Sequence, residues 1–150
     1  MSQNIGRAAH FVLRAGAGVL FLQHGLQKLF GAFGGSPAGP VTLVSMLGVA
    51  GLLELVGGIL LIAGLLTRPV AAVLVTEMIV AYFVAHLPQG GWPIQNQGEL
   101  ALLYAAIFLF LAGNGAGPVS LDEWIMETSL GDRRHAAADR RRETWTPARA

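Results

Sequence analysis

Four long apolar segments constrain this sequence of 150 residues more than any other feature. A transmembrane helix needs about 20 predominantly apolar residues, and stretches near that length alternate here with short, turn-rich connections. The composition agrees, because 53% of the residues are hydrophobic and 13% are charged, whereas soluble domains carry about 25% charged residues. The sequence therefore predicts an all-α membrane protein with spans at about residues 10–33, 41–66, 70–87 and 98–113.

The connections predict how these spans are arranged. Glycines and prolines are frequent in residues 34–40 and 88–97, and Thr67-Arg68-Pro69 separates the second span from the third. Connections this short make consecutive helices neighbours that run in opposite directions. We therefore expect one four-helix antiparallel bundle within a single domain, residues 1–130.

The sequence after the fourth span predicts a short amphipathic helix followed by a polar tail. Ser120 followed by Glu123 is typical of a helix N-cap, and Leu121, Trp124 and Ile125 predict that a short helix at about 120–130 rests an apolar face on the membrane surface. Residues 131–150 contain few large apolar side chains, and we expect them to form a flexible basic tail.

The basic residues predict the orientation. Six of the ten lie in the last eighteen positions, Arg68 lies between the second and third spans, and residues 34–40 and 88–98 contain no Lys or Arg. By the positive-inside rule, both termini lie in the cytoplasm, with the spans surrounded by the lipid of a bacterial-type inner membrane. Because this asymmetry is topological, we expect no nucleic-acid partner. Arg14 is expected to extend to the cytoplasmic surface as an anchor.

Glycines predict close helix packing on the second span. Gly48, Gly51, Gly57 and Gly58 recur there at spacings that leave a face of small residues. Such faces let helix backbones approach each other closely in lipid.

Ionisable side chains within apolar segments are costly and are functional candidates by default. His24 and Lys28 lie one turn apart on the first span, and Glu54 falls near the middle of the second. Glu77 and His86 are nine positions apart on the third span, about half a turn out of phase, so an ideal helix does not aim both at one point. We expect a polar pocket in the outward-facing half of the bundle, formed by His24, Lys28, Glu54, Glu77, His86, Glu99 and Tyr104.

Two interpretations of these residues stay open. In the functional one, His24, Glu54, Glu77 and Glu99 handle protons as catalytic groups, and Lys28, His86 and Tyr104 bind a ligand. In the structural one, the carboxyl groups pair with a cation or the backbone and hold the helices together, while Tyr104 is a packed aromatic.

Four motifs occur along most of the chain: HGLQKLFG (His24–Gly31), GLLELVGGILLIAGLLTRP (Gly51–Pro69), EMIVAYFVAHLPQGGWP with NQGELALLY (Glu77–Tyr104), and SLDEW (Ser120–Trp124). Their order over about residues 7–124 resembles the DoxX family of small four-helix membrane proteins. The resemblance implies this fold and a quinone-linked oxidoreductase role. The family name comes from a subunit associated with a terminal quinol oxidase, and related proteins serve in thiosulfate:quinone oxidation.

Several functions remain alternatives. The first is a redox subunit that binds a quinone beside a partner redox subunit, and the second is a non-enzymatic accessory of a larger complex. A permease-like or proton-conducting role, which four short helices would serve as a homo-oligomer, is a third option. A b-type haem held by His24 and His86 is a fourth, although the helical phase of His86 opposes it. The chain has no cysteine, which excludes thiol redox chemistry and iron–sulfur ligation. No Glu-x-x-His pair occurs for a di-iron centre, so we expect no metal site.

Overall fold

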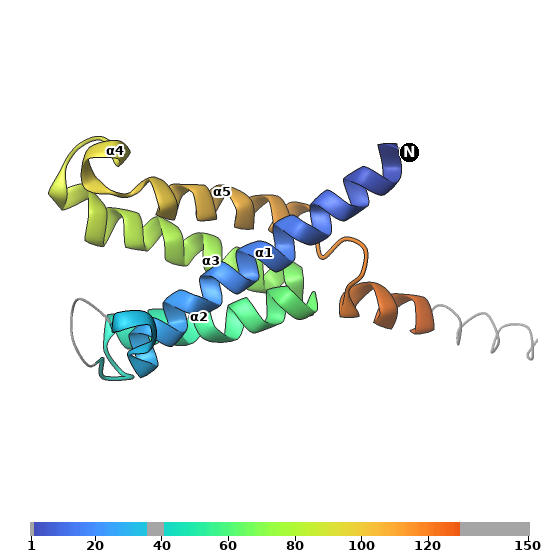
Figure 1. Cartoon of the computed structure of the whole chain (residues 1–150), viewed down its shortest axis with the longest axis horizontal. Coiled ribbons are helices and arrows are strands. Elements are labelled where there is room, and N and C mark those ends of the chain that lie inside the picture. Colours follow the sequence, from blue (N-terminus) through green and yellow to red (C-terminus); the bar gives the residue numbers. More distant parts are fainter. Residues whose placement is uncertain (1, 36–40, 130–150) are drawn as a thin grey trace, which may run out of the picture.

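The computed structural model describes residues 2–35 and 41–129, and every regular element in this part of the chain is helical. This confirms the predicted all-α class. The structure also contains a π-helical turn, which the sequence did not predict. The elements are α1 (Ser2–Phe30), η1 (Ala32–Gly34), α2 (Met46–Ala63), α3 (Thr67–Ala81), the π-helical turn η2 (Tyr82–His86), η3 (Leu87–Gln89), α4 (Pro93–Asn96), α5 (Glu99–Asn114) and a further helix at 121–129 (Figure 1).

Three continuous helical stretches are long and apolar enough to cross a membrane: Gln3–Phe30, Met46–Ala63 and Thr67–Gln89. Glu99–Asn114 is a shorter apolar helix of 16 residues. Many large apolar side chains on these helices are exposed, as expected where the neighbour is lipid rather than water. The fourth span and the closed antiparallel bundle stay predictions, and the predicted tail at 131–150 lies outside the described residues.

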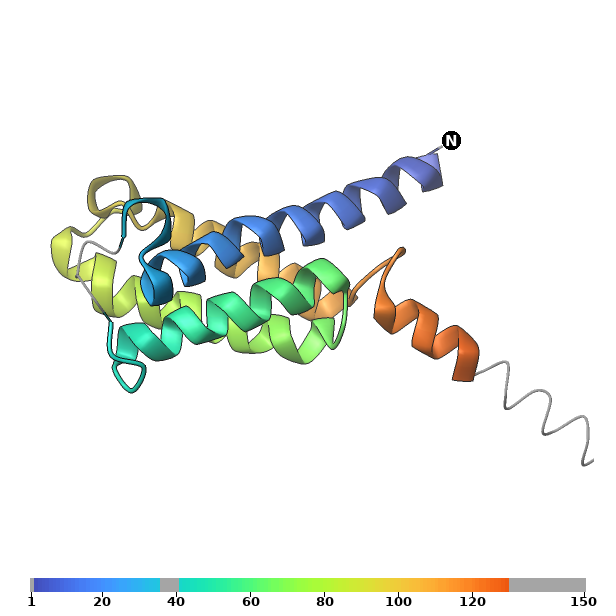
Figure 2. The same ribbon diagram turned by 60° about the horizontal axis from the view of Figure 1, so that its bottom comes forward.

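The first two helices begin at residues other than those predicted. α1 begins at Ser2 rather than near His10, and its first turns extend beyond the other helices (Figures 1 and 2). α2 begins at Met46 rather than near residue 41, because Ser45 caps it. The Ser45 hydroxyl accepts a hydrogen bond from the backbone N–H of Gly48 at 3.1 Å, which satisfies one of the free donors of the first turn.

α1 and α2 form a close pair because glycines let their backbones touch. A Cβ atom built on Gly25 would lie 2.7 Å from the Gly51 carbonyl oxygen, and one built on Gly58 would lie 2.8 Å from that of Gly18. The glycines on each helix are seven residues apart, about two turns, so they form one continuous seam. Close packing is confirmed for Gly51 and Gly58. Their partners on α1, Gly25 and Gly18, were not predicted.

α3 and α5 lie side by side and share a buried apolar core. Phe21 from α1 and Leu61 from α2 reach into the same core, so the two helix pairs are joined by apolar contact. The buried members from α3 and α5 are Ala71, Leu74, Met78, Ala101, Tyr104, Phe108 and Leu111.

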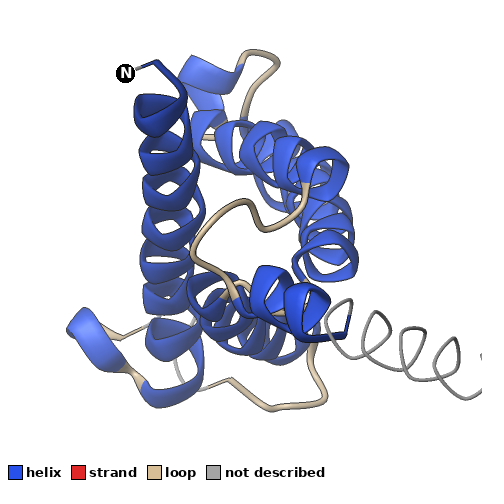
Figure 3. Ribbon diagram, turned by 90° about the vertical axis from the view of Figure 1, so that its right-hand side faces the viewer, coloured by secondary structure: helices blue, strands red, loops and turns tan. Residues whose placement is uncertain are grey.

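The segment that follows α5 crosses one end of the helices and leads into helix 121–129 (Figure 3). Asp122 accepts hydrogen bonds from the N–H groups of Leu66 at 2.8 Å and Thr67 at 2.9 Å, and so caps the start of α3. The Ser120 hydroxyl accepts one from the N–H of Glu123 at 3.1 Å, which confirms the predicted cap. Trp124 on this helix is exposed, and its contact with the membrane surface stays a prediction.

The expectation that Arg14 extends to the cytoplasmic surface is wrong. Its side chain is fully buried and donates hydrogen bonds to the carbonyl oxygens of Leu61 at 2.5 Å, Ile62 at 2.9 Å and Val119 at 2.8 Å. The last carbonyls of a helix have no partner within it, and a cation is favoured at that end. Arg14 therefore ties the end of α2 to the segment after α5.

Candidate functional site

Polar side chains from four helices meet inside the apolar bundle. His24 and Lys28 come from α1, Glu54 from α2, Glu77 from α3 and Tyr104 from α5. We call these five residues the polar cluster. The structure therefore brings together five of the seven site residues predicted from the sequence.

An ion pair forms the centre of the polar cluster. The Lys28 ammonium group donates a hydrogen bond to Oε1 of Glu54. The Glu54 side chain is 3% exposed and that of Lys28 is 23% exposed, so the pair is largely removed from solvent. Oε2 of Glu54 is buried and has no hydrogen-bond partner among the described residues.

Glu77 faces this ion pair from the other helix pair. Both of its carboxyl oxygens are shielded from solvent, and neither has a hydrogen-bond partner in the part of the chain that the structure describes. The charges of Glu54 and Lys28 both act on it. A buried polar group without a partner is uncommon in folded proteins and calls for an explanation. Within a membrane span, such a residue is a candidate for a functional site by default.

Aromatic rings enclose the polar cluster on one side. His24 meets Tyr104 edge to face, with ring centroids 6.2 Å apart and planes at 90°. Phe21 packs against Tyr104 at 5.2 Å and against Phe108 at 4.8 Å. These contacts fix the orientation of His24 and Tyr104 next to the carboxyl groups. Phe21 was not predicted as part of the site, although it precedes His24 by one turn on the same helix face.

His86 lies apart from the polar cluster. Its Nδ1 atom is 3.0 Å from the carbonyl oxygen of Asn96, and its ring stacks on Tyr82 with centroids 6.5 Å apart. Asn96 is itself buried and donates to the Gly90 carbonyl at 2.7 Å. His86 therefore anchors the loop before α5.

Glu99 also lies apart from the polar cluster. It is exposed at the start of α5, five positions before Tyr104. At about 100° per residue, this spacing turns it roughly 140° away from the face that carries Tyr104. Within residues 2–35 and 41–129, no group of three or more His, Asp or Glu side chains is placed to hold a metal ion.

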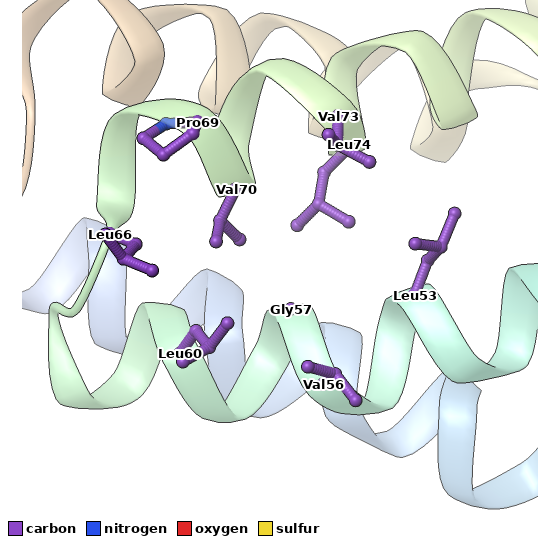
Figure 4. Close-up of a pocket in the computed structure, with 9 residues that line it drawn as sticks. All are labelled: Leu53, Val56, Gly57, Leu60, Leu66, Pro69, Val70, Val73 and Leu74. Carbon is purple, nitrogen blue, oxygen red and sulfur yellow. The ribbon is translucent and has the colours of Figure 1, made fainter.

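A groove of about 270 Å³ runs between α2 and α3 (Figure 4). Its walls are apolar, and Leu74 packs so closely on Gly57 that a Cβ atom added there would lie 3.0 Å from the Leu74 side chain. Glu77 follows Leu74 by three positions on the same face of α3, but no residue of the polar cluster is among those that line the groove. The lining residues are Leu53, Val56, Gly57, Leu60, Leu66, Pro69, Val70, Val73 and Leu74.

Long apolar helices around a buried cluster of charges define a membrane protein with an internal polar site. Comparison with known proteins narrows this class. The family model described as DoxX matches residues 9–87, more than half of the chain, and the chain belongs to the DoxX family. It is also 46% identical over 115 residues to an uncharacterized protein of Haemophilus influenzae, covering 73% of this chain and 85% of the relative. No solved structure matches the chain.

Proposed function

We propose that this chain is a subunit of a quinone-linked oxidoreductase. It crosses a bacterial-type inner membrane as a four-helix antiparallel bundle with both termini in the cytoplasm. The observation that carries the proposal is the buried, unpartnered carboxyl group of Glu77 beside the Lys28–Glu54 ion pair. Burying such a group within a membrane is costly, and ionisable residues there are candidates for proton handling or ligand binding. The resemblance to the DoxX family implies that the ligand is a quinone.

The residues of the polar cluster suit the ring oxygens of a quinone. A bound quinone supplies electron transfer coupled to proton transfer, and the protein supplies orientation and charge. Glu77 holds or accepts a proton at its free oxygens, and Lys28 stabilises negative charge on a ring oxygen. His24 and Tyr104 form the aromatic side of the site. Oε2 of Glu54 offers a further acceptor.

A second candidate function is that of a non-enzymatic accessory in a larger membrane complex. The supporting observation is helix 121–129, which Asp122 holds against the start of α3. Leu121, Trp124 and Met126 are exposed on it, and such side chains suit either a lipid surface or a partner subunit. In that case, the polar cluster stabilises the bundle and binds no ligand.

The deciding experiment is purification in detergent, followed by an absorption spectrum and organic extraction of bound quinone. Wild-type protein is compared with Glu77→Gln and with Glu99→Gln, which makes the same chemical change at an exposed position. We expect quinone with the wild type and with Glu99→Gln, and little with Glu77→Gln. If wild-type protein carries no quinone, and instead co-purifies in fixed ratio with another enzyme, the accessory function is favoured.

The orientation is tested separately by single cysteines, since the chain has none of its own. Gln95→Cys and Glu127→Cys introduce thiols at exposed positions on opposite sides of the proposed membrane. In intact spheroplasts, a membrane-impermeant maleimide should label Gln95→Cys and leave Glu127→Cys unlabelled until the membrane is opened. The reverse pattern would overturn the proposed orientation.

A further inference from the structure

We propose that the polar cluster exchanges protons with water on one side of the membrane only. The exchange takes place through the outer end of the bundle, where α1 ends at Phe30 and α5 begins at Glu99. The opposite end, which the strap (residues 115–120) crosses, is closed to water. The inference deepens the proposed function and rests on it for the orientation, in which the outer end faces away from the cytoplasm.

The polar cluster lies nearer to the outer end than to the strap. His24 is six residues before Phe30, and Tyr104 is five residues after Glu99. At about 1.5 Å per residue, these positions are about 9 Å and about 7.5 Å from the outer end. In the other direction, Tyr104 is ten residues before the end of α5, a distance of about 15 Å. The outer end is therefore the shorter route to water.

Large apolar side chains separate the polar cluster from the strap. On α1, Phe21 precedes His24 by one turn on the side of the strap, and on α5, Phe108 follows Tyr104 by one turn. The ring centroids of the two phenylalanines are 4.8 Å apart. The side chains of this layer are 0–1% exposed: Phe21, Leu61, Leu74, Phe108 and Leu111. Buried water needs polar partners and apolar interiors stay dry, so this layer carries neither water nor protons.

The strap covers the same end of the bundle (Figure 3). Its residues Gly115 and Ala116 are buried. Arg14 donates a hydrogen bond to the carbonyl oxygen of Val119 at 2.8 Å, and Nε2 of His10 lies 3.1 Å from the carbonyl oxygen of Gly115. The buried Arg14 side chain also links the strap to the end of α2. This end of the bundle is therefore closed by packing and by hydrogen bonds.

The outer side of the polar cluster is more polar and less crowded. Lys28 lies in the last turn of α1, and its side chain is 23% exposed. A lysine near a helix end keeps its charged head toward water. The core side chains of α3 and α5 on this side include the small ones of Ala81 and Ala101, and Tyr82 packs beside them with a hydroxyl group that can relay a proton. Protons therefore reach the polar cluster from the outer end.

Glu77 is the group that exchanges the proton. Both of its carboxyl oxygens lack a hydrogen-bond partner among the residues described, so either can hold a proton. The titratable groups around it on the other three helices are His24, Lys28, Glu54 and Tyr104. Because Lys28 donates its hydrogen bond to Glu54, the Glu77 carboxyl group is left to release a proton to water at the outer end and to take one up there.

Dicyclohexylcarbodiimide tests the inference, because it dissolves in the bilayer and reacts with carboxyl groups that carry a proton. Wild-type protein is labelled in right-side-out and in inside-out membrane vesicles, and the label on Glu77 is measured by mass spectrometry. The pH of the medium is varied while a buffer holds the pH inside the vesicles. Maleimide labelling of Gln95→Cys fixes which side the outer end faces.

The labelling of Glu77 should follow the pH on the side of the outer end alone. When that end faces the medium, the label should fall as the pH of the medium rises, by up to about tenfold per pH unit, the limit for one titrating proton. When the strap faces the medium, the label should stay constant until nigericin equalises the pH of the two sides.

A matched pair of cysteine variants on α3 tests the closed end. Ala71 and Ala81 both pack in the core, and Glu77 lies between them along the helix. A membrane-impermeant methanethiosulfonate should modify Ala81→Cys from the side of the outer end, and it should modify Ala71→Cys from neither side. A thermal melt in detergent checks that both variants are folded.

The outcomes separate this inference from the proposed function. The inference is refuted if the label on Glu77 follows the pH on the strap side, ignores the pH on both sides, or is absent at every pH. Modification of Ala71→Cys from the strap side refutes it as well. None of these results changes the quinone content of purified protein, on which the proposed function is judged. If labelling follows the outer pH and purified protein carries no quinone, one-sided proton exchange stands and the quinone-linked function fails.

Discussion

Replacing Gly25 by alanine tests the seam between α1 and α2. The added Cβ atom would lie 2.5 Å from the backbone nitrogen of Leu55, 2.7 Å from the Gly51 carbonyl oxygen and 2.9 Å from the Leu55 Cα atom. All three are backbone atoms, which no side-chain rotation can move away. The two helices must therefore separate over this turn, in the stretch that also carries Lys28 and Glu54.

The expected loss of stability follows from two opposing effects. Overpacking a close-packed contact costs about 1–3 kcal/mol, and the backbone location of this clash argues for the upper end. Alanine gains about 1 kcal/mol over glycine within a helix. A cost of about 3 kcal/mol reduced by about 1 leaves Gly25→Ala less stable than the wild type by about 2 kcal/mol.

Gly16→Ala is the matched control on the same helix. A Cβ atom there meets nothing within 4 Å, so the variant should be as stable as the wild type or more stable by up to about 1 kcal/mol. Unfolding is followed by far-UV circular dichroism during titration with sodium dodecyl sulfate in mixed micelles. If Gly25→Ala unfolds at the same detergent fraction as Gly16→Ala, the seam is not as close as described.

The same titration tests two further predictions, and the quinone content of purified protein tests a third. Lys28→Met should lower the free energy of unfolding by about 3–5 kcal/mol, because it leaves the buried charge of Glu54 without a partner. The double variant Lys28→Met/Glu54→Gln should recover most of this loss. A double variant as unstable as the single one would contradict the ion pair. Asp122→Ala removes the cap of α3 and should lower the free energy of unfolding by about 1 kcal/mol. Chymotrypsin should also cleave faster at Trp124, and unchanged cleavage would contradict the contact between Asp122 and the start of α3. His86→Ala should loosen the loop before α5 while leaving the quinone content of purified protein unchanged. Loss of quinone would instead show that His86 contributes to ligand binding.

Much of the fold follows from local sequence patterns. Length and apolarity predicted the helical stretches, and glycine spacing predicted that Gly51 and Gly58 pack closely, because both signals lie within one segment. The cap at Ser120 is local in the same way. Arg14 was predicted wrongly, since its partners are carbonyl oxygens on α2 and after α5. A charged residue near a helix end gives no local sign of contacts so distant in the chain.

The sequence predicted most of the residues of the candidate site, but not how they are arranged. His24, Lys28 and Glu54 could be grouped from their depth, because charged groups in a bilayer need partners. Glu99 was included for its charge, although its phase on α5 turns it away from Tyr104. The groove between α2 and α3 could not be predicted, because it depends on which face of each helix meets the other.

The ion pair between Lys28 and Glu54 joins two helices that are consecutive in the chain. During synthesis, α1 and α2 are completed before α3, so the first hairpin can enter the bilayer with its buried charges already matched. The second helix pair, α3 and α5, differs from the first. Residues 69–114 contain neither Lys nor Arg, so Glu77 has no cation on either of these two helices. The cation that acts on Glu77 is Lys28, which lies on the first hairpin and is already paired with Glu54. The order of synthesis thus completes the ion pair before the helix that carries Glu77 is made.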